Sequence, residues 1–265
     1  MKSVNNKNLC FLFSALFLFL LHMPFVFATS KTVSDFFAHT SESKTLSSPA
    51  ITVIKEKELS ASLLYDSLKL GTLGLGRQVF DYAMKGFNYM KDRGTLQNDQ
   101  VISIVDFSKP SSKKRLFILD LKNYKVLFHT YVAHGMQSGK EFARQFSNVP
   151  ESNKSSLGFY ETLETYIGGH GYSLRLQGLE RGINDNANKR DIVIHGARYV
   201  DERLINSQGY IGRSWGCPAI PQRLHKPIIN KIRNGTCLFI YSPDKNYLSR
   251  SRLLNSDQSP LLAIN

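Results

Sequence analysis

Residues 191–220 read DIVIHGARYVDERLINSQGYIGRSWGCPAI, and this stretch decides how the chain is interpreted. An apolar, β-branched run ends in His195 and Gly196, and Cys217 follows 22 residues after the histidine, between a glycine and a proline. The run predicts a strand, whereas glycine and proline do not suit the interior of a helix or strand. We therefore expect a histidine at the end of a strand and a thiol in a tight turn.

A thiol in such a turn has three interpretations: a nucleophile, half of a disulfide with Cys237, or a buried filler. A nucleophilic thiol needs a base, an oxyanion hole and partial exposure. Gly216 allows the backbone to bend sharply, so the N–H groups around Cys217 are expected to converge on a developing oxyanion. Pro218 fixes the exit of the turn.

The base must be a histidine, and three histidines are followed by glycine: His134, His170 and His195. His195 is the best candidate because it ends an apolar strand and precedes the cysteine by one loop. A zinc site is the alternative, but no histidine pair has a short ligand spacing and there is no C-x-x-C motif. The sequence also lacks a P-loop and a G-x-S-x-G motif. We expect neither a metal nor an organic cofactor.

From Gln100 onward, apolar residues recur with a period of two. Short β-branched and aromatic runs separated by turns predict strands, and DLKNYK at 120–125 predicts a hairpin. Residues 221–232 predict one helix before the last strand. The result is a mainly β domain over residues 98–248, with predicted strands at 101–107, 115–121, 125–135, 158–168, 172–178, 191–197 and 236–242.

The flanking segments differ in pattern. Residues 29–55 are rich in Ser, Thr and Lys and are expected to be a flexible lead-in. Residues 56–97 have apolar side chains three and four apart, which predicts a helical segment hinged at GTLGLG. Residues 249–265 are expected to be a loose tail.

Residues 1–28 are typical of an export signal: a short basic start, an apolar run, and small Val26 and Ala28 before the expected cleavage. A membrane anchor is the alternative, although the run from Leu9 to Leu21 is short for a span. No later segment is long and apolar enough to be a transmembrane domain. The protein is therefore expected to be exported, to the periplasm or cell envelope.

The chain of 265 residues carries a net charge of +13, from 34 Lys and Arg against 21 Asp and Glu. Residues 1–28 contain Lys2 and Lys7 and no acid, so cleavage leaves +11. Such a charge suits polyanionic surroundings such as wall polymer or lipid headgroups, or serves only to keep the protein soluble. No motif for nucleic-acid binding is present, and nucleic acid is not an expected partner.

At DIVIHGARYV and GRSWGCPAI the sequence resembles the catalytic domain of murein L,D-transpeptidases, the YkuD-like family, and the resemblance extends over residues 98–248. It implies a β-sandwich or barrel with one helix. It also implies that Cys217 is the nucleophile and His195 its base, with Ser214 and Gly216 in the turn. The sequence departs from the family's [ST]-H-G-C pattern: Trp215 replaces the histidine two before the cysteine, and Ala219 replaces an arginine common two after it.

The resemblance further implies a peptidoglycan stem peptide as substrate. The thiolate would attack the carbonyl of the third residue, release D-alanine, and pass the acyl group to an amine, forming a 3–3 crosslink, or to water. Carbapenem-like β-lactams would form an adduct with the same thiol. Trp215 is expected to wall the pocket, and the expected substrate-binding residues are His134, His170, Gly196 and Arg213.

Three other readings stay open at this point. The protein could be a peptidoglycan-binding module without catalysis, an L,D-carboxypeptidase-type hydrolase, or a structural protein in which Cys217 and Cys237 form a disulfide. A hydrolase differs from a transferase only in the acceptor. A disulfide would remove the free thiol that either enzyme needs.

Overall fold

The computed structural model of the protein describes residues 59–255. The expected signal at 1–28 and the expected lead-in at 29–55 lie outside them. Residues 59–67 are helical. The elements that follow are α3 (Arg77–Asp92), β1 (Val101–Asp106), β2 (Leu116–Asp120), β3 (Lys125–Thr130), a 3-10 turn (Met136–Ser138), β4 (Gly158–Gly168), β5 (Gly171–Gly178), β6 (Val193–Ala197), α4 (Glu202–Gln208), β7 (Ala219–Pro221), α5 (His225–Ile232), β8 (Cys237–Tyr241), α6 (Lys245–Arg250) and α7 (Arg252–Asn255).

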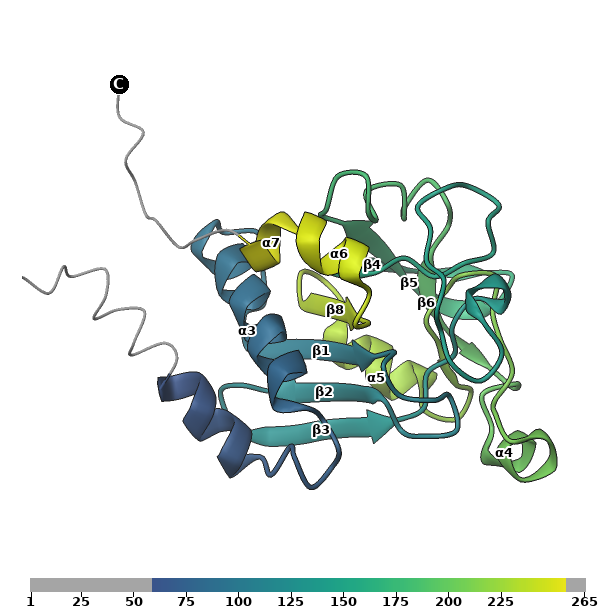
Figure 1. Ribbon diagram of the computed structural model, residues 1–265, viewed down its shortest axis with the longest axis horizontal. Coiled ribbons are helices and arrows are strands. Elements are labelled where there is room, and N and C mark those ends of the chain that lie inside the picture. Colours follow the sequence, from purple (N-terminus) through teal and green to yellow (C-terminus); the bar gives the residue numbers. More distant parts are fainter. Residues whose placement is uncertain (1–58, 256–265) are drawn as a thin grey trace, which may run out of the picture. The chain divides into compact units, whose positions relative to one another are not determined.

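The described strands form one eight-stranded sheet in the order β3-β2-β1-β8-β4-β5-β6-β7 (Figure 1). Two neighbouring pairs are parallel, β1 with β8 and β6 with β7. The remaining neighbours are antiparallel. The fold is therefore mainly β with several helices, which confirms the predicted fold class.

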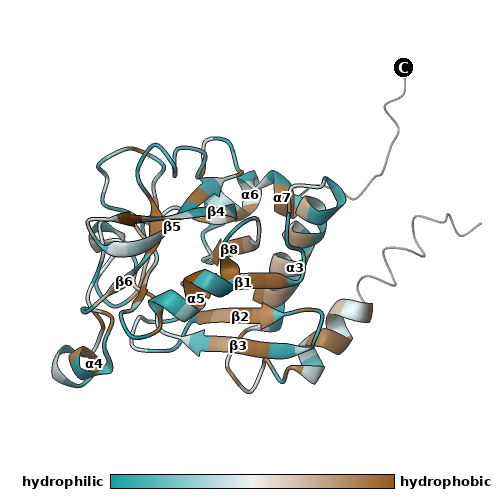
Figure 2. Ribbon diagram, turned by 180° about the vertical axis from the view of Figure 1, so that it is seen from behind, coloured by the Kyte–Doolittle hydropathy of each residue, from teal (hydrophilic) through white to brown (hydrophobic). Residues whose placement is uncertain are grey.

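The middle of the sheet is buried on both faces. Every residue of β1, β2 and β8 is buried, because helices cover both sides. Helix α3 contacts β1 and β8, whereas α5 contacts β1, β5 and β6, and Figures 1 and 2 show the two helices on opposite faces. Strands buried on both faces are expected to be continuously apolar, and Figure 2 shows β1, β2 and β8 as the most hydrophobic strands.

Helix α3 packs on the sheet through a stripe of buried side chains: Val79, Phe80, Ala83, Phe87 and Met90. Their spacing of three and four places them on one face of the helix. Gly86 lies within this face, and a Cβ atom there would overlap the ring of Phe159 on β4. That ring stacks on Phe239 of β8, with centroids 4.2 Å apart. The close approach of α3 to the sheet therefore requires glycine at 86.

The seven predicted strands all occur in the sheet. Strands β2 and β3 pair antiparallel across the predicted hairpin, with Asp120 opposite Lys125. The helix predicted over 221–232 begins later, at His225. This start places Pro227 in the first turn, where its missing N–H costs no intrahelical hydrogen bond.

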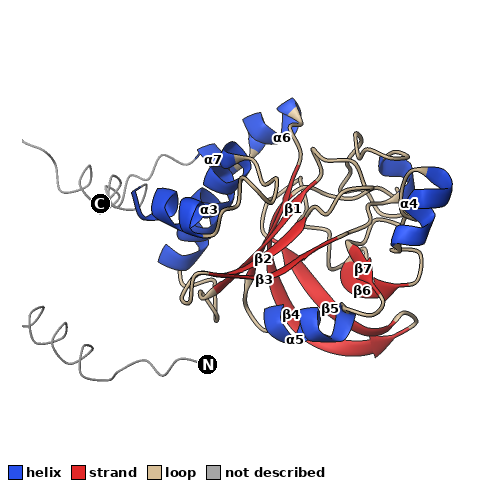
Figure 3. Cartoon of the chain, turned by 90° about the horizontal axis from the view of Figure 1, so that it is seen from below, coloured by secondary structure: helices blue, strands red, loops and turns tan. Residues whose placement is uncertain are grey.

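Some elements differ from the prediction. Strand β7 is only three residues long and has no detectable alternation. Helix α4 has no buried residue and is stabilised locally by Asp201, whose side chain accepts the Arg203 N–H. Helix α4 lies beside β6 and β7, away from α3, α6 and α7 (Figure 3). Neither element shows a hydrophobic pattern from which it could be predicted.

The predicted tail also begins too early. Residues 249–255 lie in helices α6 and α7, and α7 contacts α3. Leu253 and Leu254 are buried in the main core, so this segment belongs to the domain. Residues 256–265 lie outside the described residues. Within residues 59–255, no helix is long and apolar enough to cross a membrane.

Replacing Gly86 with alanine should destabilise the fold, because the added Cβ would push α3 away from Phe159. We expect Gly86→Ala to lower the free energy of unfolding by about 2 kcal/mol, as overpacking of a filled core does. Chemical denaturation checks this. Phe159→Leu removes the ring end that the new Cβ meets, so the double variant should lose less stability than the two single losses added together. Simple additivity would contradict the contact.

Candidate active site

The turn that carries Cys217 lies directly against β6. The Cys217 Sγ accepts the N–H of Val193 at 3.5 Å and donates its own hydrogen to the carbonyl of Asp191 at 3.5 Å. Strand β7 continues from the turn and pairs parallel with β6, so that Ala219 lies opposite His195. The fold thus brings the cysteine turn back to the strand that carries the predicted base.

Hydroxyl groups hold this turn in place. The Ser214 Oγ accepts the Gly216 N–H at 3.1 Å and donates to the Cys217 carbonyl at 2.7 Å. The Ser155 Oγ donates to the Gly216 carbonyl at 3.1 Å. The Gly216 N–H is therefore already engaged, in contrast to the sequence prediction that it contributes to an oxyanion hole. Ser214, which is buried, positions the turn.

Gly216 is required by both its conformation and its surroundings. Its φ is +127°, a region that other residues rarely adopt. A Cβ at this position would lie 2.9 Å from the Lys154 carbonyl and 2.9 Å from a methyl group of Ile192. The backbone next to Cys217 is consequently packed against the loop that contains Lys154.

His195 is held as a neutral imidazole. Its Nδ1 lies 3.0 Å from the Gly196 carbonyl. This contact assigns the ring hydrogen to Nδ1 and leaves Nε2 as a proton acceptor. Burial lowers the pKa of His195 to about 4; the hydrogen bond to Gly196 opposes this shift, and the nearby His170 and His225 add smaller downward contributions. At neutral pH the ring is therefore unprotonated.

His170 covers His195. The two rings stack with centroids 4.2 Å apart and planes 17° apart. His170 lies in the turn between β4 and β5 and is exposed, whereas His195 is buried. His170, which the sequence predicts to bind substrate, thus lies beside His195, and its role in binding stays a prediction.

The predicted contact between the thiol and the imidazole is not found. Among residues 59–255, the hydrogen bonds of Cys217 Sγ go to Asp191 and Val193, and none joins it to His195. Burial raises the pKa of the Cys217 thiol, and the Val193 N–H and the charge of Arg190 oppose this. The thiol thus lies in the turn before β7 and the imidazole lies on the neighbouring β6, and both are neutral.

Two polar residues near the sulfur were missed by the sequence analysis. The Arg190 charge lowers the pKa of Cys217. Tyr199 is half-buried, and burial, together with the charge of a thiolate at Cys217, raises its pKa above the ordinary value. Neither residue belongs to a recognisable motif. Arg190 is one of several basic residues in a polar loop, and Tyr199 follows β6 in another.

Two predicted substrate-binding residues require correction. His134 is fully buried, with Nδ1 2.7 Å from the Arg115 Nη2 and Nε2 3.3 Å from the Gly139 carbonyl, so it cannot touch a substrate. Burial, followed by the charge of Arg115, lowers its pKa to about 3. The space beside Gly196 is also filled, because a Cβ there would lie 2.7 Å from the His225 ring and 2.9 Å from Gln222.

The remaining predicted pocket residues lie at the surface of the turn. Trp215 is 77% exposed. The Arg213 Nη1 donates to the carbonyls of Met136 at 3.3 Å and Gly139 at 3.1 Å. Part of the Arg213 guanidinium is thus committed to the backbone, and its predicted role in binding a carboxylate stays a prediction.

Both cysteines of the described region, Cys217 and Cys237, are free thiols. Cys237 lies on β8 and is completely buried. The disulfide interpretation is therefore not supported. Residues 59–255 also contain no group of three or more His, Cys, Asp or Glu side chains that could hold a metal ion.

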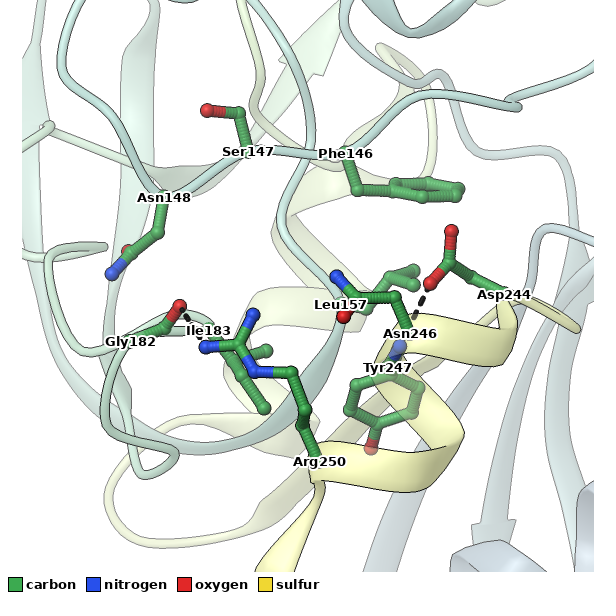
Figure 4. Close-up of a pocket in the computed structure, with 10 residues that line it drawn as sticks. All are labelled: Phe146, Ser147, Asn148, Leu157, Gly182, Ile183, Asp244, Asn246, Tyr247 and Arg250. Atoms are coloured by element: carbon green, nitrogen blue, oxygen red, sulfur yellow. Dashed lines mark hydrogen bonds between the residues drawn. The ribbon is translucent and has the colours of Figure 1, made fainter.

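A hollow of about 180 Å³ is lined in part by the loop that contains Ser147. Its walls come from residues 146–148, Gly182, Ile183 and helix α6 (Figure 4). Figure 4 shows the Arg250 guanidinium reaching across it to the Gly182 carbonyl, at 3.4 Å. Ser147 contributes to this wall and also accepts a hydrogen bond from Arg190, so the hollow adjoins the cysteine turn through one shared loop.

The sequence matches the family model described as the L,D-transpeptidase catalytic domain over residues 72–241. The chain belongs to this family. The match includes β6, the cysteine turn and α3. No curated protein matches the chain.

Solved structures of L,D-transpeptidases are similar to this chain at low identity. An L,D-transpeptidase from Mycobacterium smegmatis is 13% identical, with a TM-score of 0.33, over 54% of this chain and 59% of that chain. The transpeptidase LdtMt1 in complex with imipenem is 14% identical, with a TM-score of 0.33, over 54% and 59%. The helical cell shape determining protein Pgp2 from Campylobacter jejuni is 13% identical, with a TM-score of 0.38, over 64% and 58%. The matched region thus covers less than two thirds of each of these chains.

Gly216→Ala should distort the cysteine turn of this L,D-transpeptidase domain. A Cβ at a φ of +127° is strained and also meets the Lys154 carbonyl. We expect a loss of about 1–3 kcal/mol of stability and slower alkylation of Cys217 by iodoacetamide, both measured on the purified protein. Gly169→Ala is the matched control, since a Cβ at Gly169 meets nothing within 4 Å. Equal effects of the two substitutions would contradict the assigned constraint.

Proposed function

We propose that the protein is an exported, cysteine-dependent L,D-transpeptidase that acts on peptidoglycan stem peptides through an acyl-enzyme on Cys217. Membership of the L,D-transpeptidase catalytic domain family supports this activity. The observation that carries the proposal is the packing of the Cys217 sulfur against β6, the strand that bears an unprotonated His195. A thiol and a neutral imidazole on adjacent segments are the two groups that acyl transfer by a cysteine requires.

In the first step, the Nε2 of His195 accepts the proton of Cys217 and the thiolate attacks the carbonyl carbon of the third stem residue. The thiol donates to Asp191 before substrate binds. The sulfur must therefore exchange this hydrogen bond for one to the imidazole when the peptide enters. The Nδ1–H donated to Gly196 keeps Nε2 free for that role. Base-assisted proton transfer of this kind contributes roughly 10²–10⁴ in rate.

The oxyanion that forms needs hydrogen-bond donors near the sulfur. The Cys217 N–H contributes to lowering the pKa of its own thiol and so faces the reacting region. We propose the Tyr199 hydroxyl as a second donor, since the charge of a thiolate at Cys217 acts on Tyr199 and burial keeps this phenol neutral. Such donors are effective because they are oriented before the charge develops.

Collapse of the tetrahedral intermediate breaks the bond to D-alanine, whose amine leaves with the proton carried by His195. The thioester on Cys217 is then opened by an amine of a second stem peptide, which gives a 3–3 crosslink, or by water, which gives a trimmed stem. In both cases His195 accepts the proton of the incoming group and the thiol is regenerated. The acceptor decides between transpeptidase and L,D-carboxypeptidase activity.

The signal-like residues 1–28 and the net charge of +11 that remains after them support a location outside the cytoplasm, in the periplasm or cell envelope. A basic surface suits an anionic wall polymer.

A peptidoglycan-binding module without catalysis is the second candidate function. Two observations favour it: Trp215 is an exposed aromatic surface beside the turn, and the hydrogen bonds of the sulfur go to the backbone of β6. An exposed indole is a common binding element. A binder would retain stem peptide without releasing D-alanine.

The direct test is incubation of the protein with a disaccharide-tetrapeptide. We expect release of D-alanine and a dimer with a 3–3 crosslink, both followed by mass spectrometry, and a covalent adduct with imipenem in intact-mass spectra. Cys217→Ala should abolish all three signals, because the acyl group has no other acceptor on the enzyme.

Cys237→Ala is the matched control, since Cys237 is buried on β8 and distant from the turn in sequence. This variant should retain the product and the adduct. D-alanine release without a dimer would identify a carboxypeptidase. Peptide binding with neither product nor adduct would replace the enzymatic proposal with the binding module.

The low pKa of His195 predicts how the rate of the reaction changes as the pH falls. The imidazole acts as a base only when unprotonated, and its pKa is about 4. We expect the rate constant for imipenem adduct formation to be nearly the same at pH 5 as at pH 7, whereas with an ordinary histidine of pKa ~6.5 as the base it would fall about twenty-five-fold. Rates by intact mass from pH 4 to pH 7 check this.

The same measurement needs a stability control. His134 and His195 both have lower pKa values folded than unfolded, so the unfolded chain binds more protons and stability falls as the pH drops below about 6.5. Circular dichroism at each pH separates unfolding from loss of the base. An acid limb near pH 6.5 in folded protein would exclude the proposed state of His195.

A further inference from the structure

Arg190 lies beneath the cysteine turn and is held by four neutral acceptors. Its Nη1 donates to the Ser147 carbonyl at 2.7 Å and to the Ser156 Oγ at 2.5 Å. Its Nη2 donates to the Ser152 Oγ at 3.1 Å and to the Lys154 carbonyl at 2.8 Å. The side chain is thus fixed in one place by a single loop.

The charge of Arg190 has no carboxylate partner. None of the ion pairs within residues 59–255 includes it, and its Nε is buried without a hydrogen-bond partner. Burial lowers the pKa of Arg190, but a guanidinium remains charged in proteins. A half-buried cation surrounded only by neutral groups favours any anion that forms beside it.

The group beside it is the cysteine turn. A Cβ placed on Gly216 would lie 3.6 Å from the Arg190 Nη2 and 2.9 Å from the Lys154 carbonyl that this nitrogen binds. Arg190 also directly precedes Asp191, whose carbonyl accepts the Cys217 thiol. The Arg190 guanidinium therefore lies beside Gly216, and the Cys217 sulfur is hydrogen-bonded to the residue that follows Arg190. Both groups thus lie at the Gly216–Cys217 turn.

Other titratable groups near the sulfur do not supply a positive charge. Asp191 raises the pKa of Cys217, and Tyr199 interacts with the thiolate as a neutral or anionic group. His195 is unprotonated at neutral pH, and Trp215, next to the turn, cannot carry charge. Of these groups and Arg190, only the guanidinium is a cation at neutral pH.

We propose that Arg190 is a positioning residue that stabilises the Cys217 thiolate through its charge, acting from beneath the turn. This inference rests on the proposed function, in which that thiolate is the nucleophile. In such a site an opposite charge favours the ionised thiol. It would favour the thiolate form while His195 carries the proton.

The test is the pH dependence of Cys217 alkylation by iodoacetamide, from pH 6 to pH 10, with the modified peptide identified by mass spectrometry. Arg190→Gln removes the charge, and Arg190→Lys retains it while losing the bidentate hydrogen bonds. We expect Arg190→Gln to raise the apparent pKa of the thiol by about one unit, and thus to slow alkylation at pH 7 about ten-fold. Arg190→Lys should restore most of the rate.

A second pair of variants leaves Arg190 in place, in case its removal prevents folding. Ser152 accepts a hydrogen bond from the guanidinium, so Ser152→Asp would pair with the charge and neutralise it. We expect Ser152→Asp to raise the thiol pKa in the same direction as Arg190→Gln. Ser152→Asn, which has nearly the same shape and no charge, should leave it near the native value.

The outcomes separate the proposal from a structural role. If Arg190 only anchors the loop, Arg190→Lys and Arg190→Gln will shift the thiol pKa equally, or Ser152→Asp and Ser152→Asn will behave alike. Either result would overturn the proposal. Alkylation reports the thiol and not turnover, so absence of D-alanine release would reject the proposed function while leaving this test readable.

Discussion

The hydrogen-bonded attachment of the Gly216–Cys217 turn to β6 is the constraint on which the site depends. Within residues 59–255 the sulfur hydrogen-bonds to two backbone groups, the N–H of Val193 in β6 and the carbonyl of Asp191 just before that strand. Strand β6 is paired on both sides, with β5 and β7, so the thiol position follows the sheet and not a flexible loop. Three features keep the turn pressed against this strand: a glycine with φ of +127°, serine hydroxyls that satisfy its polar groups, and a loop packed beneath it.

Burial then sets the protonation states on which the chemistry depends. The pKa of His195 is lowered because the ring is enclosed between β5, β7 and His170, whereas that of Cys217 is raised for the same reason. A low dielectric disfavours both charged forms, so the resting pair is neutral. Forming an ion pair from two neutral groups requires an additional source of stabilisation, and Arg190 is a fixed charge in the right region.

The sequence contained enough to predict the sheet and to bring the cysteine turn next to the strand that bears His195. Alternating runs marked seven strands, and the His-Gly strand end and the Gly-Cys-Pro turn placed His195 and Cys217 on neighbouring elements. It did not reveal the burial of His134, because His-Gly looks the same whether the ring faces Arg115 or a substrate. Arg190 and Tyr199 were also missed, since both approach the sulfur only through tertiary packing. Helix α4 has no buried residue, and short β7 has no period to detect.

The sequence predicts a contact between the Cys217 thiol and the His195 imidazole, but the sulfur instead contacts the backbone of Asp191 and Val193. This difference affects the mechanism. A sulfur that donates to Asp191 is protonated, and a proton acceptor on the adjacent strand cannot remove that proton until the sulfur turns away from the carbonyl. Substrate entry is the event that can supply this change, because a peptide competes for the space and the hydrogen bonds at the turn. Under the proposed mechanism the protein would then form the Cys217 thiolate only when an acyl donor is present, and would expose little reactive thiolate in its absence. In this arrangement the Arg190 charge stabilises the thiolate most after the sulfur has moved away from Asp191. A charge interaction acts across the turn and needs no direct hydrogen bond.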